Sequence, residues 1–394
     1  MKGRCVLAYS GGLDTSVAIR HLSDQGYEVI AVTVDVGQGG DPDELVRRGK
    51  AAGAVEVRLV DAVETFATSF VWPAVRANGL YEGRYPLVSA LARPLIATKI
   101  VDVAREVDAT TAAHGCTGKG NDQVRFEVSL AALAPDLAVL APVRDGKLSR
   151  TEAVDIARRF DIPVEATSKV YSVDENLWGR TIECGPLEDP WGEPPADAFE
   201  RTVDPTTAPD EATELVVRFE AGVPTAIDRT LLDPVSLIHR VGEAAGSNGF
   251  GRVDMVENRL VGIKSRELYE VPAALAIISA HRDLEGLTLE RDLAHHKSSA
   301  VEPRWSELVY NGLWYSPLRE ALDAFVESTQ GDVEGEVRLR FHRGSCSILG
   351  RRSDRSLYDR GLATYGEGDC FDQEDARGFV RLFGLPVRLW GERG

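Results

Sequence analysis

The chain has 394 residues, more than one ordinary domain holds, so we expect two or three domains. Hydrophobic residues make up 43% of the chain and charged residues 27%, as in ordinary globular proteins. The net charge of −17 argues against a nucleic-acid partner, because phosphate backbones bind basic surfaces.

Cysteine usage and hydropathy narrow the class further. The apolar run near the N-terminus ends at Ser10, which is too short for the core of a signal peptide. No long apolar stretch predicts a membrane span. The cysteines are odd in number, scattered and never spaced as Cys-x-x-Cys, which argues against a disulfide framework or a zinc site and favours a reducing cytoplasm: Cys5, Cys116, Cys184, Cys346 and Cys370.

Residues 1–165 alternate apolar strands with amphipathic helices. This alternation predicts an α/β domain whose parallel, doubly wound sheet binds a nucleotide and is covered on both faces. Ligands of such sheets bind beyond the carboxyl ends of the strands, so we expect the Ser10–Ser16 loop, Asp35 and the Gly115–Asp122 loop to share one rim. The pattern predicts strands at 5–9, 28–35, 55–60, 109–114 and 137–141, and helices after residue 12 and at 42–52, 62–76, 91–107 and 122–134.

The pattern changes near residue 163. Strand-like stretches at 215–219 and 253–263, a hairpin of 336–341 with 345–349, and helical stretches from 234 to 328 predict a second, α+β domain over residues 166–365. No clear periodicity marks residues 171–184. The last segment, residues 366–394, contains an amphipathic stretch, and we expect either an arm that packs on a partner subunit or a frayed terminus.

The first informative loop reads SGGLDTS from Ser10 to Ser16 and joins a buried strand to a helix. Paired glycines allow a sharp turn and close approach of a ligand, and the helix start presents unpaired N–H groups and its positive dipole end. Thr15 and the two serines add hydroxyls, and Asp14 offers a carboxylate for Mg²⁺ on the phosphates. Two glycines alone favour a plain tight turn, but the full string favours a phosphate-binding loop.

The second informative loop, residues 114–127, reads HGCTGKGNDQVRFE and again lies between a strand and a helix. The spacing around Lys119 does not fit a Walker A loop. Asn121 and Asp122 either cap the helix or, on a ligand rim, hold an ammonium group, and Arg125 is a good partner for a carboxylate. The combination favours an amino-acid site over capping and surface charge.

Two other clusters point to no site. His295 and His296 are adjacent, so they do not face one ligand from a helix, and we expect no metal there. The basic residues Arg351, Arg352 and Arg355 are interpreted as a salt-bridge patch on the surface or between subunits.

The first loop resembles the pyrophosphate loop of the N-type ATP pyrophosphatases, which split ATP into AMP and pyrophosphate while they adenylate a substrate oxygen. The two loops together resemble those of the argininosuccinate synthase family. The resemblance to this family extends over nearly the whole chain. Further matching strings are Gly37-Gln38-Gly39, Arg84-Tyr85-Pro86-Leu87, Ala92-Arg93-Pro94, Ser172-Val173-Asp174-Glu175-Asn176-Leu177, Val256-Glu257-Asn258-Arg259, Gly262-Ile263-Lys264-Ser265-Arg266, Tyr269-Glu270, Leu308-Val309-Tyr310 and Ser356-Leu357-Tyr358.

The resemblance implies a cytoplasmic ATP-dependent C–N ligase of arginine biosynthesis, usually a homotetramer. The ureido oxygen of citrulline would attack the α-phosphorus of ATP and expel pyrophosphate. The amine of aspartate would then displace AMP and give argininosuccinate. We expect no covalent enzyme nucleophile, because the enzyme has to align the reactants and stabilise phosphate charge.

The resemblance also implies roles for individual residues. ATP would be bound by Ala8, Tyr9, Ser10, Gly11, Gly12, Leu13, Asp14, Thr15, Ser16, Val34 and Gly115, with Asp14 as a contact for Mg²⁺. Aspartate would be held by Thr117, Asn121 and Asp122. Citrulline would be held by Tyr85, Ser89, Asn121, Arg125, Ser172, Thr181, Glu257 and Tyr269.

The citrulline side departs from the usual family pattern. Ser89-Ala90 stands where many relatives carry Thr-Ser, so either Ser89 supplies the hydroxyl or that contact is absent. Thr181 replaces a common serine and keeps its hydroxyl. Glu257 lies in an apolar, strand-like context, where an unpaired carboxylate is costly unless a ligand ammonium satisfies it.

Three other functions are alternatives to this ligase. A glutamine-dependent synthetase would need an amidotransferase domain, and a tRNA thiolase would want a basic surface and paired cysteines. A nucleotide-binding sensor without turnover would not need Asn121, Asp122 and Arg125, nor a large second domain.

Overall fold

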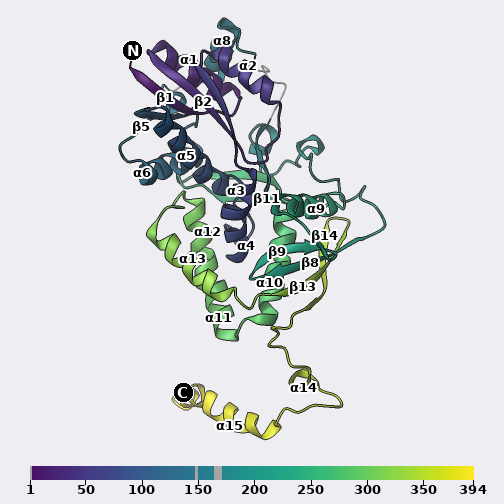
Figure 1. The fold of residues 1–394 in the computed structure, drawn as a ribbon. Helices are drawn as coiled ribbons and strands as arrows, with labels where there is room; N and C mark the ends of the chain where they lie inside the picture. Colours follow the sequence, from purple (N-terminus) through teal and green to yellow (C-terminus); the bar gives the residue numbers. More distant parts are fainter. Residues whose placement is uncertain (1, 147–149, 164–170) are drawn as a thin grey trace.

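A computed structural model describes residues 2–146, 150–163 and 171–394. The N-terminal part, purple to dark blue in Figure 1, is built on a parallel sheet. Its strand order is β3-β2-β1-β4-β5. This confirms the predicted doubly wound nucleotide-binding sheet. The strands are β1 Gly3–Ala8, β2 Tyr27–Asp35, β3 Glu56–Asp61, β4 Thr111–His114 and β5 Ala138–Leu140.

Alternate residues of β1 explain why helices cover both faces of the sheet. Cys5 and Leu7 pack with apolar residues of α1 on one face, whereas Val6 and Ala8 join the cluster around α5 on the other. Both faces are thereby removed from water, as a parallel sheet requires. The first face carries α1 Leu13–Asp24, α2 Pro42–Ala52, α7 Pro142–Asp145 and α8 Arg150–Arg159, and the second carries α5 Val88–Glu106, α6 Asp122–Leu133 and α3 Val63–Phe66.

Two long helices of this protein widen to a π-turn in the middle. The predicted helix at 62–76 is continuous, but it runs as α3, then the π-segment η1 Ala67–Val71, then α4 Trp72–Arg76. In the second domain α11 Arg291–His296 passes through the π-segment η4 Lys297–Val301 into α12 Glu302–Tyr310.

The second domain contains two antiparallel sheets and confirms the predicted α+β class. One sheet has the order β10-β9-β8-β13-β14 and the other β11-β12-β7-β6. The strands are β6 Ser172–Asn176, β7 Gly179–Glu183, β8 Thr213–Glu220, β9 Val223–Ile227, β10 Thr230–Leu231, β11 Arg252–Asn258, β12 Lys264–Glu270, β13 Gly335–His342 and β14 Ser345–Arg352. The other helices are η2 Gly185–Glu188, η3 Ala196–Ala198, α9 Pro234–Gly246, α10 Pro272–Thr288 and α13 Pro317–Thr329.

Five strands of this domain were not predicted from the sequence: β6, β7, β9, β10 and β12. The stretch 253–263 is not one strand, because β11 ends at Asn258 and the chain turns back into β12. β6 and β7 form a hairpin where no periodicity was visible. Their inward side chains include Asp174 and Thr181, which face polar neighbours rather than an apolar core, so hydrophobic alternation is missing. The predicted domain boundary, 165/166, falls in residues 164–170, outside the described residues.

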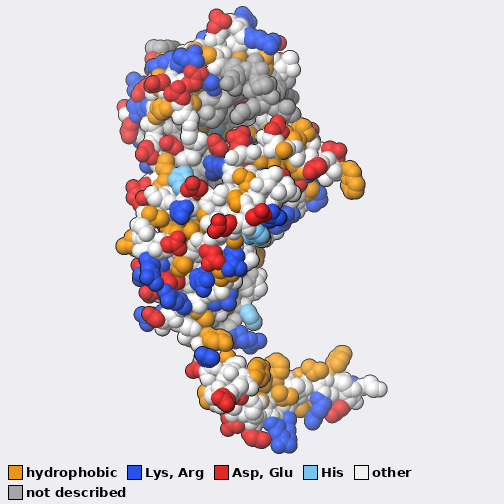
Figure 2. Space-filling model, turned by 90° about the vertical axis from the view of Figure 1, so that its right-hand side faces the viewer, with side chains coloured by type: hydrophobic (Ala, Val, Ile, Leu, Met, Phe, Trp, Pro, Cys, Tyr) orange, Lys and Arg blue, Asp and Glu red, His pale blue; other side chains and the backbone are white. Residues whose placement is uncertain are grey.

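The C-terminal segment leaves the body of the molecule as an arm (Figure 1). It comprises α14 Arg360–Ala363, α15 Gln373–Phe383 and α16 Leu385–Gly391, and no residue of these helices is buried. Asp372 caps α15 by accepting from the backbone N–H of Glu374. Figure 2 shows hydrophobic side chains gathered along it, and those of Phe379, Val380, Leu382, Phe383, Val387, Leu389 and Trp390 are at least half exposed.

Over the described ranges of the chain, no helix has both the length and the apolarity to cross a membrane.

Candidate functional site

A cavity of about 670 Å³ opens at the carboxyl ends of β1, β2 and β4. The two loops singled out by the sequence both line it, which confirms that they share one rim. Asp35 does not line the cavity, because its carboxylate turns back to accept from the backbone N–H of Gly37 at 2.8 Å. Lining residues from the two loops and β2 are Ala8, Tyr9, Ser10, Asp14, Thr15, Val32, Thr33, Val34, His114, Gly115, Cys116 and Asp122.

The phosphate loop has the backbone that its glycines predict. Gly11 has φ +78°, and a Cβ there would lie 2.3 Å from a methyl carbon of Leu45. Gly12 precedes α1 and brings no side chain to cap it. The Thr15 hydroxyl contacts the Ser10 hydroxyl at 3.2 Å and donates to the carbonyl of Gly12 at 3.3 Å. The first turn of α1 therefore faces the cavity with uncapped N–H groups.

The two loops touch each other at Gly115. A Cβ at this position would lie 2.8 Å from the Thr15 methyl group and 3.2 Å from its Cα. Only a glycine allows this approach without a shift. One continuous wall therefore joins the phosphate loop to the loop that was predicted to hold amino acids.

The end of β2 is shaped by a side chain that the sequence analysis did not assign. Gln38 donates to the carbonyl of Val34 at 2.9 Å and accepts from the backbone N–H of Val36 at 2.7 Å. Val34 lines the cavity, and its carbonyl already accepts the hydrogen bond from Gln38.

The charges that line the cavity are mostly negative. The arginines among them are Arg48, which lies against Glu44 and the carbonyl of Gly11, and Arg93, on α5. Part of this negative charge is cancelled by neighbouring arginines rather than left for a ligand. The carboxylates are those of Asp14, Asp41, Glu44, Asp122, Asp174 and Glu175.

Asn121 and Asp122 do not cap α6. Asn121 is buried and donates to the Tyr310 hydroxyl at 2.8 Å, while its carbonyl oxygen accepts from the backbone N–H of Leu260 at 2.9 Å. The amide thus joins the second loop to α12 and to the turn between β11 and β12. The capping alternative is wrong for both residues, since the side chains turn toward the second domain and toward arginines. Thr117 lies exposed in the same loop.

A chain of alternating charges leads from Asp122 into the second domain. Arg125 donates to one carboxylate oxygen of Asp122 at 2.9 Å, and Arg93 donates to the other at 2.9 Å. Arg93 also donates to Asp174 of β6 at 2.7 Å. Burial alone would raise the pKa of Asp122, but the guanidinium groups of Arg93 and Arg125 outweigh burial and hold it below its usual range.

Ser89 places a hydroxyl beside Ala90. Its hydroxyl donates to Asp174 at 2.6 Å and lies 3.4 Å from the Thr181 hydroxyl, and its backbone N–H donates to the Tyr85 hydroxyl at 2.9 Å. A hydroxyl is therefore present at this point, although the Ala90 side chain is apolar and buried.

Glu257 is buried but not unpaired, which corrects the argument made from the sequence. Its two carboxylate oxygens accept from the hydroxyl groups of Tyr269 at 2.7 Å and Tyr310 at 2.8 Å. Burial, with the negative charge of Glu257, raises the pKa of both tyrosines, so they remain hydrogen-bond donors. The Tyr269 ring stacks on Tyr85 at 4.4 Å, and the Tyr310 ring stacks on Tyr81 at 3.5 Å.

One network therefore unites most of the residues predicted for the amino acids: Tyr85, Ser89, Asn121, Asp122, Arg125, Thr181, Glu257 and Tyr269. Ser172 is exposed at the start of β6, and no hydrogen bond of its side chain joins it to this network among the described residues. Four further residues of the network were not predicted from the sequence: Arg93, Asp174, Tyr310 and Tyr81. The first three stand in strings that matched the family, so their polar or aromatic character inside those strings was the available signal.

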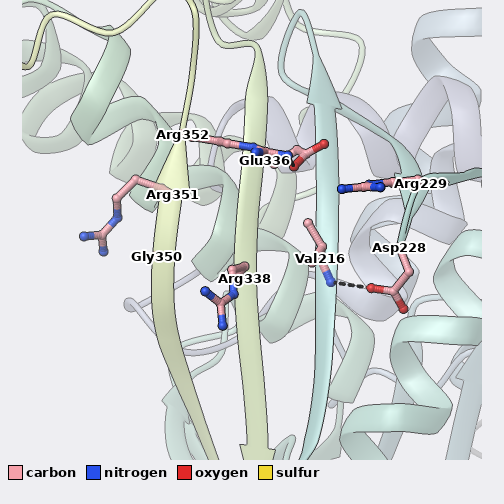
Figure 3. Close-up of a pocket in the computed structure, with 8 residues that line it drawn as sticks. All are labelled: Val216, Asp228, Arg229, Glu336, Arg338, Gly350, Arg351 and Arg352. Carbon is pink, nitrogen blue, oxygen red and sulfur yellow. Dashed lines mark hydrogen bonds and ion pairs between the residues drawn. The ribbon is translucent and has the colours of Figure 1, made fainter.

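A second hollow of similar size, about 630 Å³, lies over the sheet that contains β8 and β13 (Figure 3). Arg351 is paired with Asp283, and Arg352 with Glu336. Neither a glycine-rich turn nor a helix start is among its lining residues. It matches the predicted salt-bridge patch, not a nucleotide site.

Two family profiles match the chain. The one described as "Arginosuccinate synthase N-terminal HUP domain" matches residues 4–163, and "Arginosuccinate synthase C-terminal domain" matches residues 171–390. A protein of Rubrobacter xylanophilus named "Argininosuccinate synthase" is 54% identical over 98% of this chain and 95% of its own length. One of the same name from Lactiplantibacillus plantarum is 52% identical over 98% and 94%.

The similarity of this chain to the following solved structure is much weaker. A complex titled "Crystal structure of a 4-thiouridine synthetase - RNA complex with bound ATP" is 16% identical over 41% of either chain, with a TM-score of 0.31. At that score the likeness supports no conclusion about this chain.

Proposed function

Because the chain belongs to the argininosuccinate synthase family, we propose a division of its reaction among the residues described above. The chain is an ATP-dependent ligase of arginine biosynthesis: it condenses citrulline and aspartate to argininosuccinate and releases AMP and pyrophosphate. The close approach of Gly115 and Thr15 supports the proposed placement, since the Ser10–Ser16 loop and the Gly115–Asp122 loop share one wall.

ATP would occupy the cavity at the end of the parallel sheet. Its pyrophosphate end would lie on the Ser10–Ser16 loop, where uncapped N–H groups and hydroxyls converge. The adenosine end would lie against the end of β2, at Val34. The α-phosphate would then point toward Gly115 and Asp122.

Mg²⁺ would enter as Mg-ATP. The part of the chain that the structure describes holds no group of three or more His, Cys, Asp or Glu able to bind a metal ion. Mg²⁺ usually binds through substrate phosphates, waters and one or two carboxylates, and Asp14 lines the cavity beside Ser10 and Thr15. These residues fit an ion carried by the nucleotide.

The amino acids would occupy the network beyond Gly115. We assign citrulline to the side of Tyr85, Ser89, Thr181, Glu257 and Tyr269, with Arg125 as a carboxylate partner and Ser172 nearby on β6. Aspartate would be held by Thr117, Asn121 and Asp122. Hydrogen bonds among Asn121, Tyr310 and Glu257 fix this polar wall before a ligand arrives, which lowers the cost of ordering it on binding.

The residues would act by alignment and charge rather than by covalent attachment. The urea of citrulline is a poor electrophile, and transfer of AMP to its oxygen makes that oxygen a good leaving group. Cys116 lies beside the cavity, but burial, with the charge of Asp122, raises the pKa of its thiol, so it stays protonated and unreactive.

We also propose a homotetramer in which the C-terminal arm packs on another copy. The arm exposes large apolar side chains and buries none, which is typical of a surface that awaits a partner. Phe383→Asp should lower the mass measured by light scattering, whereas Arg377→Asp on the same helix should not; equal masses for all three proteins would contradict the role of the arm. All five cysteines are free, which supports a cytoplasmic location.

The test is pyrophosphate release from Mg-ATP with citrulline and aspartate omitted in turn. We expect release that requires citrulline, and sustained turnover only when aspartate is added. Binding of ATP with no release under any combination would instead favour a nucleotide-binding protein without turnover.

A further inference from the structure

Arg93 lies where the nucleotide cavity meets the amino-acid network. It stands on α5, lines the same cavity as Ser10, Thr15 and Gly115, and its side chain is only 14% exposed. It was not among the residues predicted to bind a substrate. An arginine so placed either supports the fold or serves the reaction.

The contacts of Arg93 leave part of its guanidinium unused. Nε donates to Asp122 at 2.9 Å, and Nη2 donates to Asp174 at 2.7 Å. Asp174 is itself held by the Ser89 hydroxyl. Nη1 has no hydrogen-bond partner within the described ranges of the chain. A guanidinium offers five N–H donors in a rigid fork, so donors remain for a ligand after both carboxylates are served.

The charge of Arg93 is secured by the same contacts. Burial alone would lower its pKa, but the carboxylates of Asp122 and Asp174 outweigh burial and raise it. The group therefore takes no part in proton transfer. It is a fixed positive charge, positioned from the N-terminal domain by Asp122 and from the second domain by Asp174.

Cations are scarce in a cavity that must hold a polyphosphate. Its lining includes six carboxylates but only two arginines among the described residues. Arg48 lies on α2 beside Gly11, on the side of the phosphate loop. Arg93 lies on the other side, next to the residues assigned to the amino acids. With ATP in this cavity, Arg48 would lie near the departing pyrophosphate and Arg93 near the phosphorus that is attacked.

We propose that Arg93 is a catalytic residue that contacts the non-bridging oxygens of the α-phosphoryl group while citrulline is adenylated. This inference rests on the assignment of the cavity to ATP made above. In that step the ureido oxygen forms a bond to the α-phosphorus. The bond from that phosphorus to the oxygen bridging to the β-phosphorus breaks, and its electron pair leaves with pyrophosphate. The ureido nitrogens keep their protons, so the adenylated group is a cation.

The proposal gives Arg93 a task that backbone N–H groups of the phosphate loop do not share. Negative charge on the α-phosphoryl oxygens rearranges during the displacement, and a preorganised guanidinium stabilises it without reorientation. Asp122 and Asp174 act as positioning residues, because they reach the nucleotide only through Arg93 in this role.

The test measures citrulline-dependent exchange of labelled pyrophosphate into ATP, without aspartate, so that only adenylation is observed. Arg93→Ala should slow exchange at saturating substrates about 100- to 1000-fold, the usual loss for a missing electrostatic stabiliser. The dissociation constant of ATP should change less than about fivefold. Arg105→Ala is the matched control, because Arg105 lies on the same helix, is exposed and pairs with Asp136 away from the cavity; its exchange rate should match that of the unaltered protein.

Two further readouts separate catalysis from a structural role. Guanidinium added at millimolar concentration should raise the exchange rate of Arg93→Ala at least tenfold, since the cavity is open to solutes. With ATP analogues that carry sulfur on the α-phosphorus, the preference between the two diastereomers should shrink in Arg93→Lys.

Exchange within threefold of the unaltered protein in Arg93→Ala would overturn the proposal. So would a slow variant that guanidinium does not rescue and that has lost ATP binding, because that result describes a support for the pocket. If the unaltered protein itself shows no citrulline-dependent exchange, the assignment of the cavity fails first, and the two failures are thereby distinguished.

Discussion

The phosphate loop and the amino-acid network are built in different ways. The loop is one short run of chain whose backbone we propose to bind phosphate, and its shape depends on glycines at a strand–helix turn. The network gathers single side chains from α5, α6, α12 and four strands of the second domain. A site made of contiguous backbone tolerates movement between domains, whereas a site made across domains exists only when they are in place. ATP affinity should therefore depend on local strain, and amino-acid affinity on long-range contacts.

The largest expected effect tests the local side of this comparison. Gly11→Ala places a side chain at a positive φ and against Leu45, which costs about 1 to 3 kcal/mol between strain and overlap. The KM for ATP should rise roughly 10- to 100-fold, while the KM for citrulline at saturating ATP changes little. Steady-state kinetics measure both.

Gly26→Ala is the matched control for this change. Gly26 also has a positive φ, +92°, but a Cβ there meets open space and lies outside the cavity. Its KM for ATP should equal that of the unaltered protein. A rise as large as in Gly11→Ala would mean that global strain, not the loop, controls ATP affinity.

The next effect tests the long-range side. Glu257→Gln keeps the shape of the side chain but replaces two charge-assisted hydrogen bonds from Tyr269 and Tyr310. Hydrogen bonds to charged groups contribute about 1.5 to 3 kcal/mol, so the KM for citrulline should rise at least tenfold with the KM for ATP unchanged. An unaltered citrulline requirement would remove Glu257 from the site.

A smaller and more selective effect is expected at Asp122. Asp122→Asn keeps an oxygen for one arginine but loses the charge proposed to hold the aspartate ammonium. We expect the KM for aspartate to rise roughly tenfold and citrulline-dependent pyrophosphate exchange to fall by less. Equal losses in both would mean that Asp122 acts through Arg93 and Arg125 alone.

The smallest effect is a pH dependence of stability. Burial, with the nearby carboxylates Glu183 and Glu257, raises the pKa of Glu267 to about 8 from its usual value near 4.5. The folded chain then binds one proton more than the unfolded chain between these values, so this group's contribution is present below pH 4.5 and is lost as the pH rises through about 8.

Melting temperatures from pH 5 to 9 measure this contribution. Glutamine at position 267 cannot ionise. The melting temperature of Glu267→Gln, relative to that of the unaltered protein, should therefore rise with the pH. Parallel profiles would show that Arg259, which pairs with Glu267, keeps the carboxylate ionised throughout.

Sequence predicted the local site better than the distributed one for the same physical reason. A strand, two glycines and a helix start are adjacent in the chain, so their pattern implies their geometry. Glu257 and Tyr310 lie 53 positions apart, and no periodicity reveals that one accepts a hydrogen bond from the other. β6 and β7 were missed because Asp174 and Thr181 on one face serve the network, and only the other face packs in a small hydrophobic cluster, through Val173 and Ile182. Capping by Asn121 stayed open as an alternative because its hydrogen bond to Tyr310 joins residues 189 positions apart.

The contact between Gly115 and Thr15 limits which residues can occur together at these two positions among homologues. The nearest atom to a hypothetical Cβ at position 115 is the methyl group of Thr15, which serine lacks. Among homologues, a residue larger than glycine at position 115 should therefore occur only where position 15 has lost its methyl group. Because the Thr15 backbone is also within 3.3 Å, even that pair should be rare. The two loops should be inherited together, and a graft of either one into a different scaffold should fail unless the other goes with it.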